Sequence, residues 1–416
     1  MEITKLFFTD EDSGQNPFFD KHWEEAKAIF SSNSIFFLEP DYIIESSRML
    51  NLPQDAIETL VQYREQIVDD SLSKNLFLYL HYCLFHVSDY PLSWITQWPS
   101  SINDSEAETD SFYLLLLLSG LKKLKQFYQD KSIPVNVFQD TIADMKRRFE
   151  QYQHENRRYG IAKNSITWFT NHFRGKLFQL GRLQFVLGFL MNEITVFRNK
   201  DTDLVMALSK KNLRKKGDGI VGNPILPNGK TIEKQTFLSF VNWKQVLTKG
   251  DPILDIHIPA GGSLTRELCR DSFKAALKFF PEYFPKHNFK AFACNAWLLD
   301  NQFQELLPAS ANIIRFQKEF YLVPISTVPK DIMKRIFGSD FRNLNEIKPK
   351  TTLQKVALQH ILKGYTFQGG GGFLLPEDVK RGPQVYIDQI LDIEKAIARK
   401  SEHMKREVVG NSIPLI

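Results

Sequence analysis

The spacing of apolar residues divides the chain into a helical part and a part that mixes strands with helices. Over residues 1–155 the apolar residues recur every three or four positions, the spacing of helices that bury one face. This pattern predicts six helical segments, at 18–30, 41–50, 53–68, 73–87, 112–128 and 135–152. Residues 89–110 carry two prolines and an acidic, Ser-rich patch, so we predict a loop there.

The pattern changes after residue 158. Residues 177–190 and 193–198 are rich in β-branched and aromatic residues, and Met191-Asn192 between them indicates an antiparallel hairpin. Residues 209–231 contain many glycines and prolines, which favour a long loop or a short hairpin. Further strands are predicted at 237–247 and 312–323.

The most informative stretch is 250–300. It reads as a strand (252–258), a turn at Pro259-Ala-Gly-Gly262, a helix from Leu264 to about Phe280 and a second strand (289–299). The first N–H groups of such a helix have no partner within the helix, and the helix dipole adds positive charge at the same end. The turn is therefore a predicted site for an anion such as a pyrophosphate.

From residue 326 on, the chain reads as an extension, with helices near 330–337, 352–363 and 384–406. The four glycines at 369–372 lack the Lys and Ser/Thr of a phosphate-binding loop, so a flexible turn or bulge is the prediction there. The expected fold is α+β: a helical domain (1–155), a mixed-sheet domain (156–325) and an extension (326–416) that packs on the sheet domain.

Composition and charge narrow the function classes. There are 53 basic and 48 acidic residues, a net charge of +5, which is too weak to indicate nucleic acid. Three basic clusters (146–148, 157–158 and 210–216) are expected to be solvated, with nucleic-acid binding as a remote alternative.

Three cysteines in a chain of this length form no disulfide framework and suit a reduced cytoplasm. No signal peptide is evident, and the most apolar run (112–118) is too short to span a bilayer, so we expect no membrane association.

One cluster could suggest a metal site. His81, Cys83 and His86 lie close in the sequence, but spacings of two and five do not place three ligands on one helical face. We expect these residues to pack in the core, and we expect no metal.

Four segments in order resemble a bacterial acyltransferase family that pairs a helical N-terminal domain with a C-terminal domain like those of the GNAT acyltransferases. They are 180–184, 255–262, 293–300 and 312–317. The resemblance implies a GNAT-like mixed sheet and an acyl-CoA donor, expected to be acetyl-CoA, whose pyrophosphate lies on the turn before the central helix. The superfamily pattern Gln/Arg-x-x-Gly-x-Gly/Ala falls on His257-Ile-Pro-Ala-Gly-Gly262, with Ala260 at a usual glycine and Pro259 lacking an N–H donor.

The resemblance also implies where the donor binds. The pantetheine arm would lie along the strand 254–258, parted from the strand 289–299, and bind backbone groups as an added strand does. The donor-binding residues are then expected to be Ile256, Ile258, Ala260, Gly261, Gly262, Ser263 and Leu264.

The implied reaction is attack of an amine, on a small molecule or a peptide, at the thioester. The amine must lose a proton, and the oxyanion must be stabilised. Candidates are His257 as base, Asn295 as a polar contact to substrate or donor, and Glu193 as an alternative base. Cys294 is a weaker candidate because buried thiols are usually inert. Arg182 and Gln184 either line an acceptor site or form a solvated face.

A second hypothesis is a GNAT-fold binding or regulatory protein that binds CoA or another ligand without catalysis, since a fold does not establish an activity. The acceptor, the oligomeric state and the pathway stay open.

Overall fold

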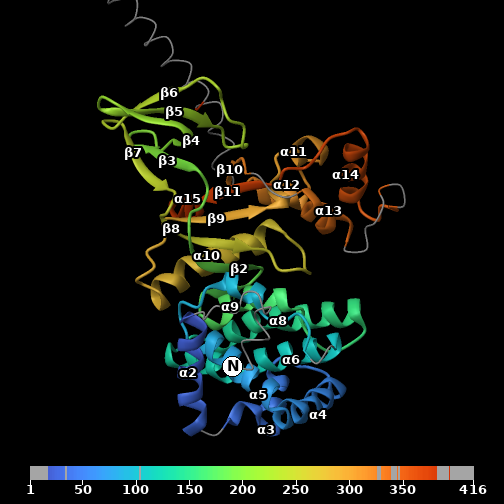
Figure 1. Ribbon diagram of the computed structural model, residues 1–416. Coiled ribbons are helices and arrows are strands. Elements are labelled where there is room, and N and C mark those ends of the chain that lie inside the picture. Colours follow the sequence, from blue (N-terminus) through green and yellow to red (C-terminus); the bar gives the residue numbers. More distant parts are fainter. Residues whose placement is uncertain are drawn as a thin grey trace, which may run out of the picture. The chain divides into compact units, whose positions relative to one another are not determined.

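The computed structural model describes residues 17–32, 35–102, 105–325, 329–338, 344, 347–381 and 393. The chain forms two compact units, residues 1–180 and 181–416 (Figure 1). The fold class is α+β, as predicted: a helical unit is followed by a unit of mixed sheets and helices.

The described part of the first unit is built from helices around α6 (Glu106–Ser119), whose residues 109–119 are all buried. The other helices are α2 (Pro17–Ser32), α3 (Pro40–Met49), α4 (Gln54–Asp69), α5 (Ser71–Phe85), α7 (Leu121–Asp130), α8 (Val135–Asn156) and α9 (Lys163–Phe173), and the unit ends with the short strand β1 (Leu177–Leu180). Side-chain caps set two of the helix starts. Asp70 accepts a hydrogen bond from the Ser73 N–H before α5, and Ser105 accepts one from the Glu108 N–H before α6.

The prediction of one helix over 112–128 was wrong, because the chain breaks into α6 and α7 at Gly120. A Cβ atom at Gly120 would lie 2.3 Å from the Phe85 ring, so the absence of a side chain at this position lets Phe85 of α5 approach closely. The predicted loop at 89–110 ends early, since α6 begins at Glu106. Helix α9 was not predicted. It packs on α6, α7 and α8, which carries the first unit past residue 155 to Leu180.

The residues His81, Cys83 and His86 lie on or next to α5. Cys83 is fully buried, and His81 is 5% exposed. The His81 ring stacks on Phe37, and its Nδ1 lies 2.8 Å from the Ser119 hydroxyl. His81 and Cys83 therefore pack in the core of the first unit, as predicted, whereas the prediction was wrong for His86, which is exposed.

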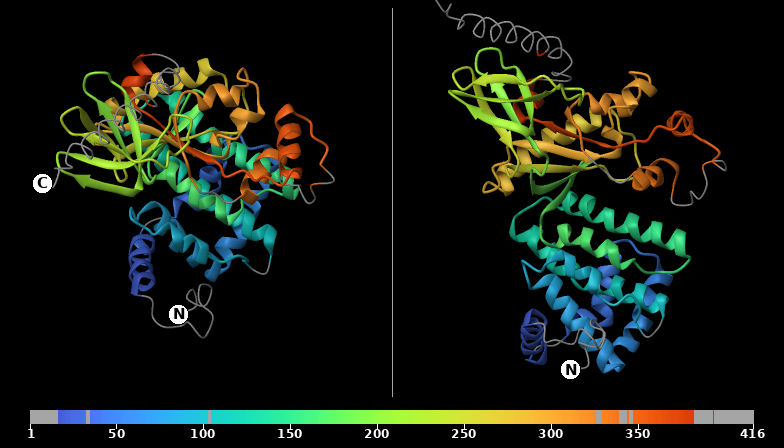
Figure 2. Two further views of the ribbon diagram at one scale, coloured as in Figure 1. Left: turned by 90° about the horizontal axis from the view of Figure 1, so that it is seen from above. Right: turned by 45° about the horizontal axis from the view of Figure 1, so that its top comes forward.

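The second unit contains two sheets. In this unit the first sheet runs in the order β2 (Leu183–Phe189), β8 (Pro252–His257), β9 (Ala291–Ala296), β11 (Gly370–Leu374), β10 (Tyr321–Val323). Its β8–β9 pair is parallel, and the neighbouring pairs are antiparallel. The second sheet is antiparallel, in the order β6 (Thr236–Ser239), β5 (Gly219–Ile225), β4 (Val205–Lys216), β3 (Ile194–Asn199), β7 (Trp243–Thr248). Figure 2 shows it, in green to yellow-green, as a layer of its own.

The two faces of the first sheet have different partners, because successive side chains of a strand point to opposite faces. One face packs on α10 (Arg266–Tyr283), where Phe273 contacts Phe292 at 5.3 Å between ring centres and Phe280 contacts Phe185 at 6.1 Å. The other face packs on the second sheet. Its side chains Ile253, Ala291, Ala293, Tyr321, Val323 and Phe373 form one buried cluster with Ile194, Val196, Val205, Ala207, Ile225 and Leu247.

Several strand predictions need correction. The predicted hairpin of 177–190 with 193–198 was wrong, because β2 pairs with β8 whereas β3 pairs with β4 and β7. Met191-Asn192 therefore connects two sheets. The run 209–231 includes a hairpin formed by β4 and β5, one of the two alternatives. The predicted strand 237–247 is two strands, β6 and β7, that are not neighbours.

The predicted strand 312–323 begins instead with a helix, α12 (Asn312–Gln317), and only its last three residues form β10. The reason is tertiary. Gln317 is fully buried, and its side-chain amide donates to the carbonyls of Leu298 and Asp300 at 2.8 Å each. Phe316, one position before it, is buried as well. An extended strand would not direct adjacent side chains into the same interior.

The rest of the second unit consists of short helices and β11. The helices are α11 (Phe303–Leu306), α13 (Pro329–Phe337), α14 (Thr352–Leu362) and α15 (Pro376–Arg381). The predicted helix at 384–406 lies outside the described residues except for Ile393. No helix in the described parts of the chain is long and apolar enough to cross a membrane.

The prediction of a flexible turn or bulge at the four-glycine run was wrong. The run supplies most of β11, inside the first sheet. A Cβ atom at Gly370 would lie 1.9 Å from the Leu299 carbonyl oxygen, and one at Gly372 would lie 2.9 Å from Phe320 Cβ. The strand is rich in glycine because neighbouring atoms fill the space of its side chains. The segment expected to be an extension that packs on the sheet domain thus contributes a strand to the sheet itself.

This close approach predicts that Gly370→Ala destabilises the second unit by about 2–3 kcal/mol, the usual cost of overpacking a core. The measurement is the free energy of unfolding in guanidinium, followed by circular dichroism. Gly188→Ala is the matched control. It also lies in a strand of this sheet, but a Cβ atom there meets its nearest neighbour at 3.8 Å. We expect it to change stability by less than about 1 kcal/mol. Equal stability of the two variants would contradict the explanation.

Candidate functional site

The strands β8 and β9 part in the middle of the sheet. Their pairing runs through Ile253–Ala291, Leu254–Phe292 and Asp255–Ala293 and stops there. On its other side β8 stays paired with β2 as far as His257, and β9 stays paired with β11 as far as Ala296. Each strand is thus held by its outer neighbour while its inner edge loses its partner. Backbone groups on both inner edges become available to a ligand.

The chain leaves β8 through the predicted glycine turn. Gly261 and Gly262 have φ angles of +79° and +70°, in the region that favours glycine. Nothing lies within 4 Å of a Cβ atom at Gly261, and the nearest atom to one at Gly262 is Arg182 Nε at 3.7 Å. The glycines are therefore required by the backbone conformation and not by lack of space.

The Arg182 side chain holds this turn from the inside. Its guanidinium donates to the carbonyl oxygens of Pro259 and Ser263 at 3.0 Å each and to that of Gly262 at 3.5 Å. The Arg182 N–H in turn donates to the Ser272 hydroxyl on α10. The Arg182 side chain therefore fixes three carbonyls of the turn, and α10, the helix after the turn, holds the Arg182 backbone.

The amides of the turn are open. Within the described residues, none of the N–H groups of 260–264 donates a hydrogen bond, and residues 260–263 are exposed. Helix α10 follows directly, with Thr265 as its N-cap accepting from the Leu268 N–H. Open amides and a helix N-terminus at one place make an arrangement that binds an anion.

His257 and Asn295 lie at the two sides of the parting. The pairing of Asp255 with Ala293 places these residues two positions further along, on the same face of the sheet. His257 Nε2 lies 3.2 Å from Asp255 Oδ2, and both side chains are more than one third exposed. Asn295 is exposed, and its side-chain oxygen accepts from Asn192 Nδ2 at 2.9 Å. Asn192 belongs to the connection between the two sheets.

Three other candidates are placed less favourably for chemistry. The exposed Glu193 carboxylate accepts a hydrogen bond from Lys249, which lowers its pKa, so it is already engaged with a cation. Cys294 points to the face that packs on α10, and burial raises the pKa of its thiol, as in an inert cysteine. Gln184 is 1% exposed, so Arg182 and Gln184 do not form a solvated face.

Arg182 was predicted only as part of an acceptor site or of a solvated face, and its role in holding the turn was not predicted. Its only signal is its place one residue before a strand, because the carbonyls that it binds lie about 80 positions later in the chain. Among the described residues, no group of three His, Cys, Asp or Glu side chains could hold a metal ion.

Comparison with known proteins agrees with this architecture. Residues 42–175 match the N-acyltransferase N-terminal domain, and residues 177–374 match the GNAT-like C-terminal domain. No curated protein matches the chain.

Solved structures of acyltransferases share the fold at low sequence identity. One is a mutant in complex with octanoyl-CoA, 20% identical, with a TM-score of 0.58 over 80% of this chain and 88% of the other. A second, in complex with decanoyl-CoA and teicoplanin, is 20% identical, with a TM-score of 0.57 over 79% of this chain and 86% of the other. A third, in complex with decanoyl-CoA, is 19% identical, with a TM-score of 0.52 over 80% and 99%. The two matched domains together span residues 42–374, so this chain belongs to the family that joins an N-acyltransferase N-terminal domain to a GNAT-like C-terminal domain.

Proposed function

We propose that this protein transfers an acyl group from acyl-CoA to an amine. The observation that carries the proposal is the parting of β8 and β9 beside a turn with open amides. The diphosphate of CoA would bind the N–H groups of 260–264, and the pantetheine arm would lie along residues 256–258. An extended arm can then bind the free edge of β8 as an added strand does.

The proposed donor carries a medium-length acyl chain. The expectation of acetyl-CoA has no support from the comparisons, whereas the similar solved structures hold octanoyl-CoA and decanoyl-CoA. One of these acyltransferases also holds teicoplanin. By analogy we propose an amine on a glycopeptide-like molecule as the acceptor of this protein.

The reaction needs a base at the parting, and His257 is our candidate. The amine nitrogen attacks the thioester carbon, the new C–N bond forms, and the C–S bond breaks to release CoA as a thiol. His257 would take the proton that the amine loses, and the neighbouring Asp255 carboxylate would balance the resulting positive charge. The same proton would then pass to the leaving thiolate, which gives the thiol and restores neutral His257. Backbone N–H groups on the free strand edges would stabilise the oxyanion. Asn295 would contact the substrate from the β9 side.

The direct test of the proposal is release of free CoA thiol from decanoyl-, octanoyl- and acetyl-CoA in the presence of amine acceptors, teicoplanin among them. We expect kcat/KM to be at least about tenfold higher for the two longer donors, because additional methylenes are buried. Acyl-CoA binding without turnover of any acceptor would favour the alternative of a binding or regulatory protein. No binding of CoA would reject both.

The open amides predict that Gly262→Asp weakens CoA binding at least about tenfold, because a carboxylate would face the diphosphate. Titration calorimetry with CoA measures the effect. Gly217→Asp is the matched control, since Gly217 also has a positive φ (+55°) and open space around it but lies in the β4–β5 turn. Both variants place the same charge on a residue whose φ is positive. If both bind CoA like the unaltered protein, the donor site lies elsewhere.

The proposed base predicts that His257→Gln lowers kcat about 10²- to 10⁴-fold while the Kd for CoA changes little. Steady-state kinetics and calorimetry on the same preparation separate the two effects. His154→Gln, at an exposed position of α8, is the control and should leave kcat unchanged. A His257→Gln enzyme with normal kcat would exclude this residue as the base.

A further inference from the structure

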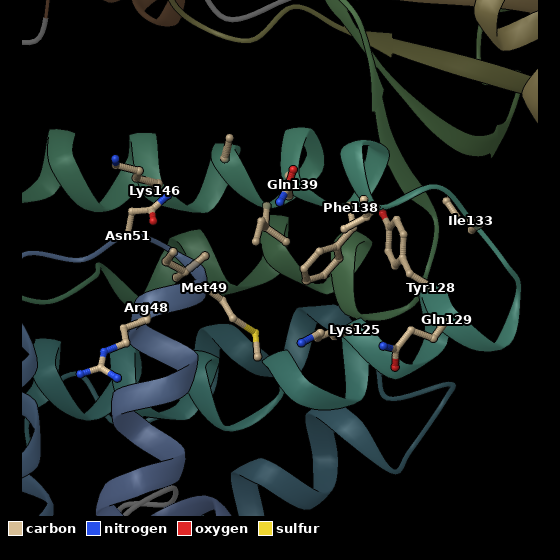
Figure 3. A pocket seen from close by; sticks show the side chains of 14 residues that line it. Arg48, Met49, Asn51, Lys125, Tyr128, Gln129, Ile133, Phe138, Gln139 and Lys146 are labelled. Atoms are coloured by element: carbon tan, nitrogen blue, oxygen red, sulfur yellow. The ribbon is translucent and has the colours of Figure 1, made fainter.

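A pocket of about 660 Å³ lies within the first unit, among α3, α7 and α8. Its volume is within the usual range for small-molecule sites. The inner wall is apolar and buried: Leu50, Tyr128, Ile133, Phe138 and Ile142 are each 3–6% exposed. Figure 3 shows the Met49 side chain of α3 pointing toward Lys125 of α7. The pocket therefore offers a lipophilic interior that the mechanism proposed above does not use.

The charged side chains around this pocket are all basic. Arg48, Lys125 and Lys146 line it, and no Asp or Glu is among its lining residues, all of which belong to the described part of the chain. Two carboxylates outside the lining interact with basic residues here: Glu45 pairs with Lys122 and also feels the charge of Lys125, and Glu150 lies 3.7 Å from Lys146. Such exposed pairs are weak and leave the cations able to bind another anion.

The apolar wall and the basic lining together select one kind of ligand. A straight aliphatic chain can cover the wall without leaving a polar group unpaired, and one terminal carboxylate can pair with the cations. A neutral lipid would give the cations no additional partner, and a small inorganic anion would leave the apolar wall in water. We propose that this pocket binds a fatty acid, that is, a single aliphatic chain ending in a carboxylate.

The test is titration calorimetry of the full chain with dodecanoate below its micelle concentration, and with dodecanol as the uncharged probe of equal length. We expect one dodecanoate per chain and binding of dodecanol weaker by about tenfold or more, since it lacks the charge-assisted hydrogen bonds. Equal affinity for the two would overturn the assignment of a carboxylate. Absence of dodecanoate binding would overturn the site.

Two variants tie the binding to this pocket. Val135 lines the pocket, is 68% exposed and stands at the first position of α8, so replacing it does not disturb the core. Val135→Glu should weaken dodecanoate binding about threefold to tenfold by charge repulsion, and the matched Val135→Lys should not.

Ala143→Phe should fill the pocket and weaken dodecanoate binding at least about tenfold, and the melting temperature of this variant should be measured alongside. Unchanged affinity in both Val135→Glu and Ala143→Phe would reject the site.

A competition experiment separates this site from the proposed donor site. Saturating CoA should not displace dodecanoate, and Gly262→Asp should bind dodecanoate with unchanged affinity. Displacement by CoA would overturn the inference, because the fatty acid would then occupy the donor site. A protein that binds dodecanoate in this pocket but does not bind CoA would retain the inference and lose the proposed function.

Discussion

The candidate site depends on one constraint in the first sheet: β8 and β9 pair for three residues and then separate, while their outer partners hold them in place. β2 holds β8 as far as His257, and β11 holds β9 as far as Ala296. The outer partners thus fix both strands where their own pairing has stopped. The glycine run of β11 is part of this constraint because only a strand without side chains can lie so close to residues 299–300 and Phe320.

The parting also separates the roles of neighbouring residues. Cys294 and Asn295 are adjacent, but alternation along β9 directs the first to the face packed on α10 and leaves the second exposed on the other face. The same alternation places His257 and Asp255 together on the Asn295 face. Chemistry at the parting therefore falls to polar groups of one face, and the thiol belongs to the core.

The turn after β8 is held by a charged side chain, that of Arg182. Arg182 binds the carbonyls of residues 259, 262 and 263, so the negative ends of these peptide groups face a fixed cation. With its carbonyls engaged, the turn keeps its amides open and the paired glycines in their left-handed conformation. The cation itself also favours an anion nearby, in addition to the N-terminus of α10.

The sequence by itself determined the elements whose hydrogen bonds and caps are local. The helical spacing of the first unit, and the strand, glycine turn and helix of 252–283, could be predicted because each rests on residues a few positions apart. Partner choice in the sheets, the break at Gly120, the helix at 312–317 and the glycine strand were decided by tertiary structure. In each case the deciding contact comes from far along the chain, as Phe85 does for Gly120 and Leu299 for Gly370. Arg182 belongs to the same class, because no local pattern records a guanidinium whose acceptors lie about 80 residues away.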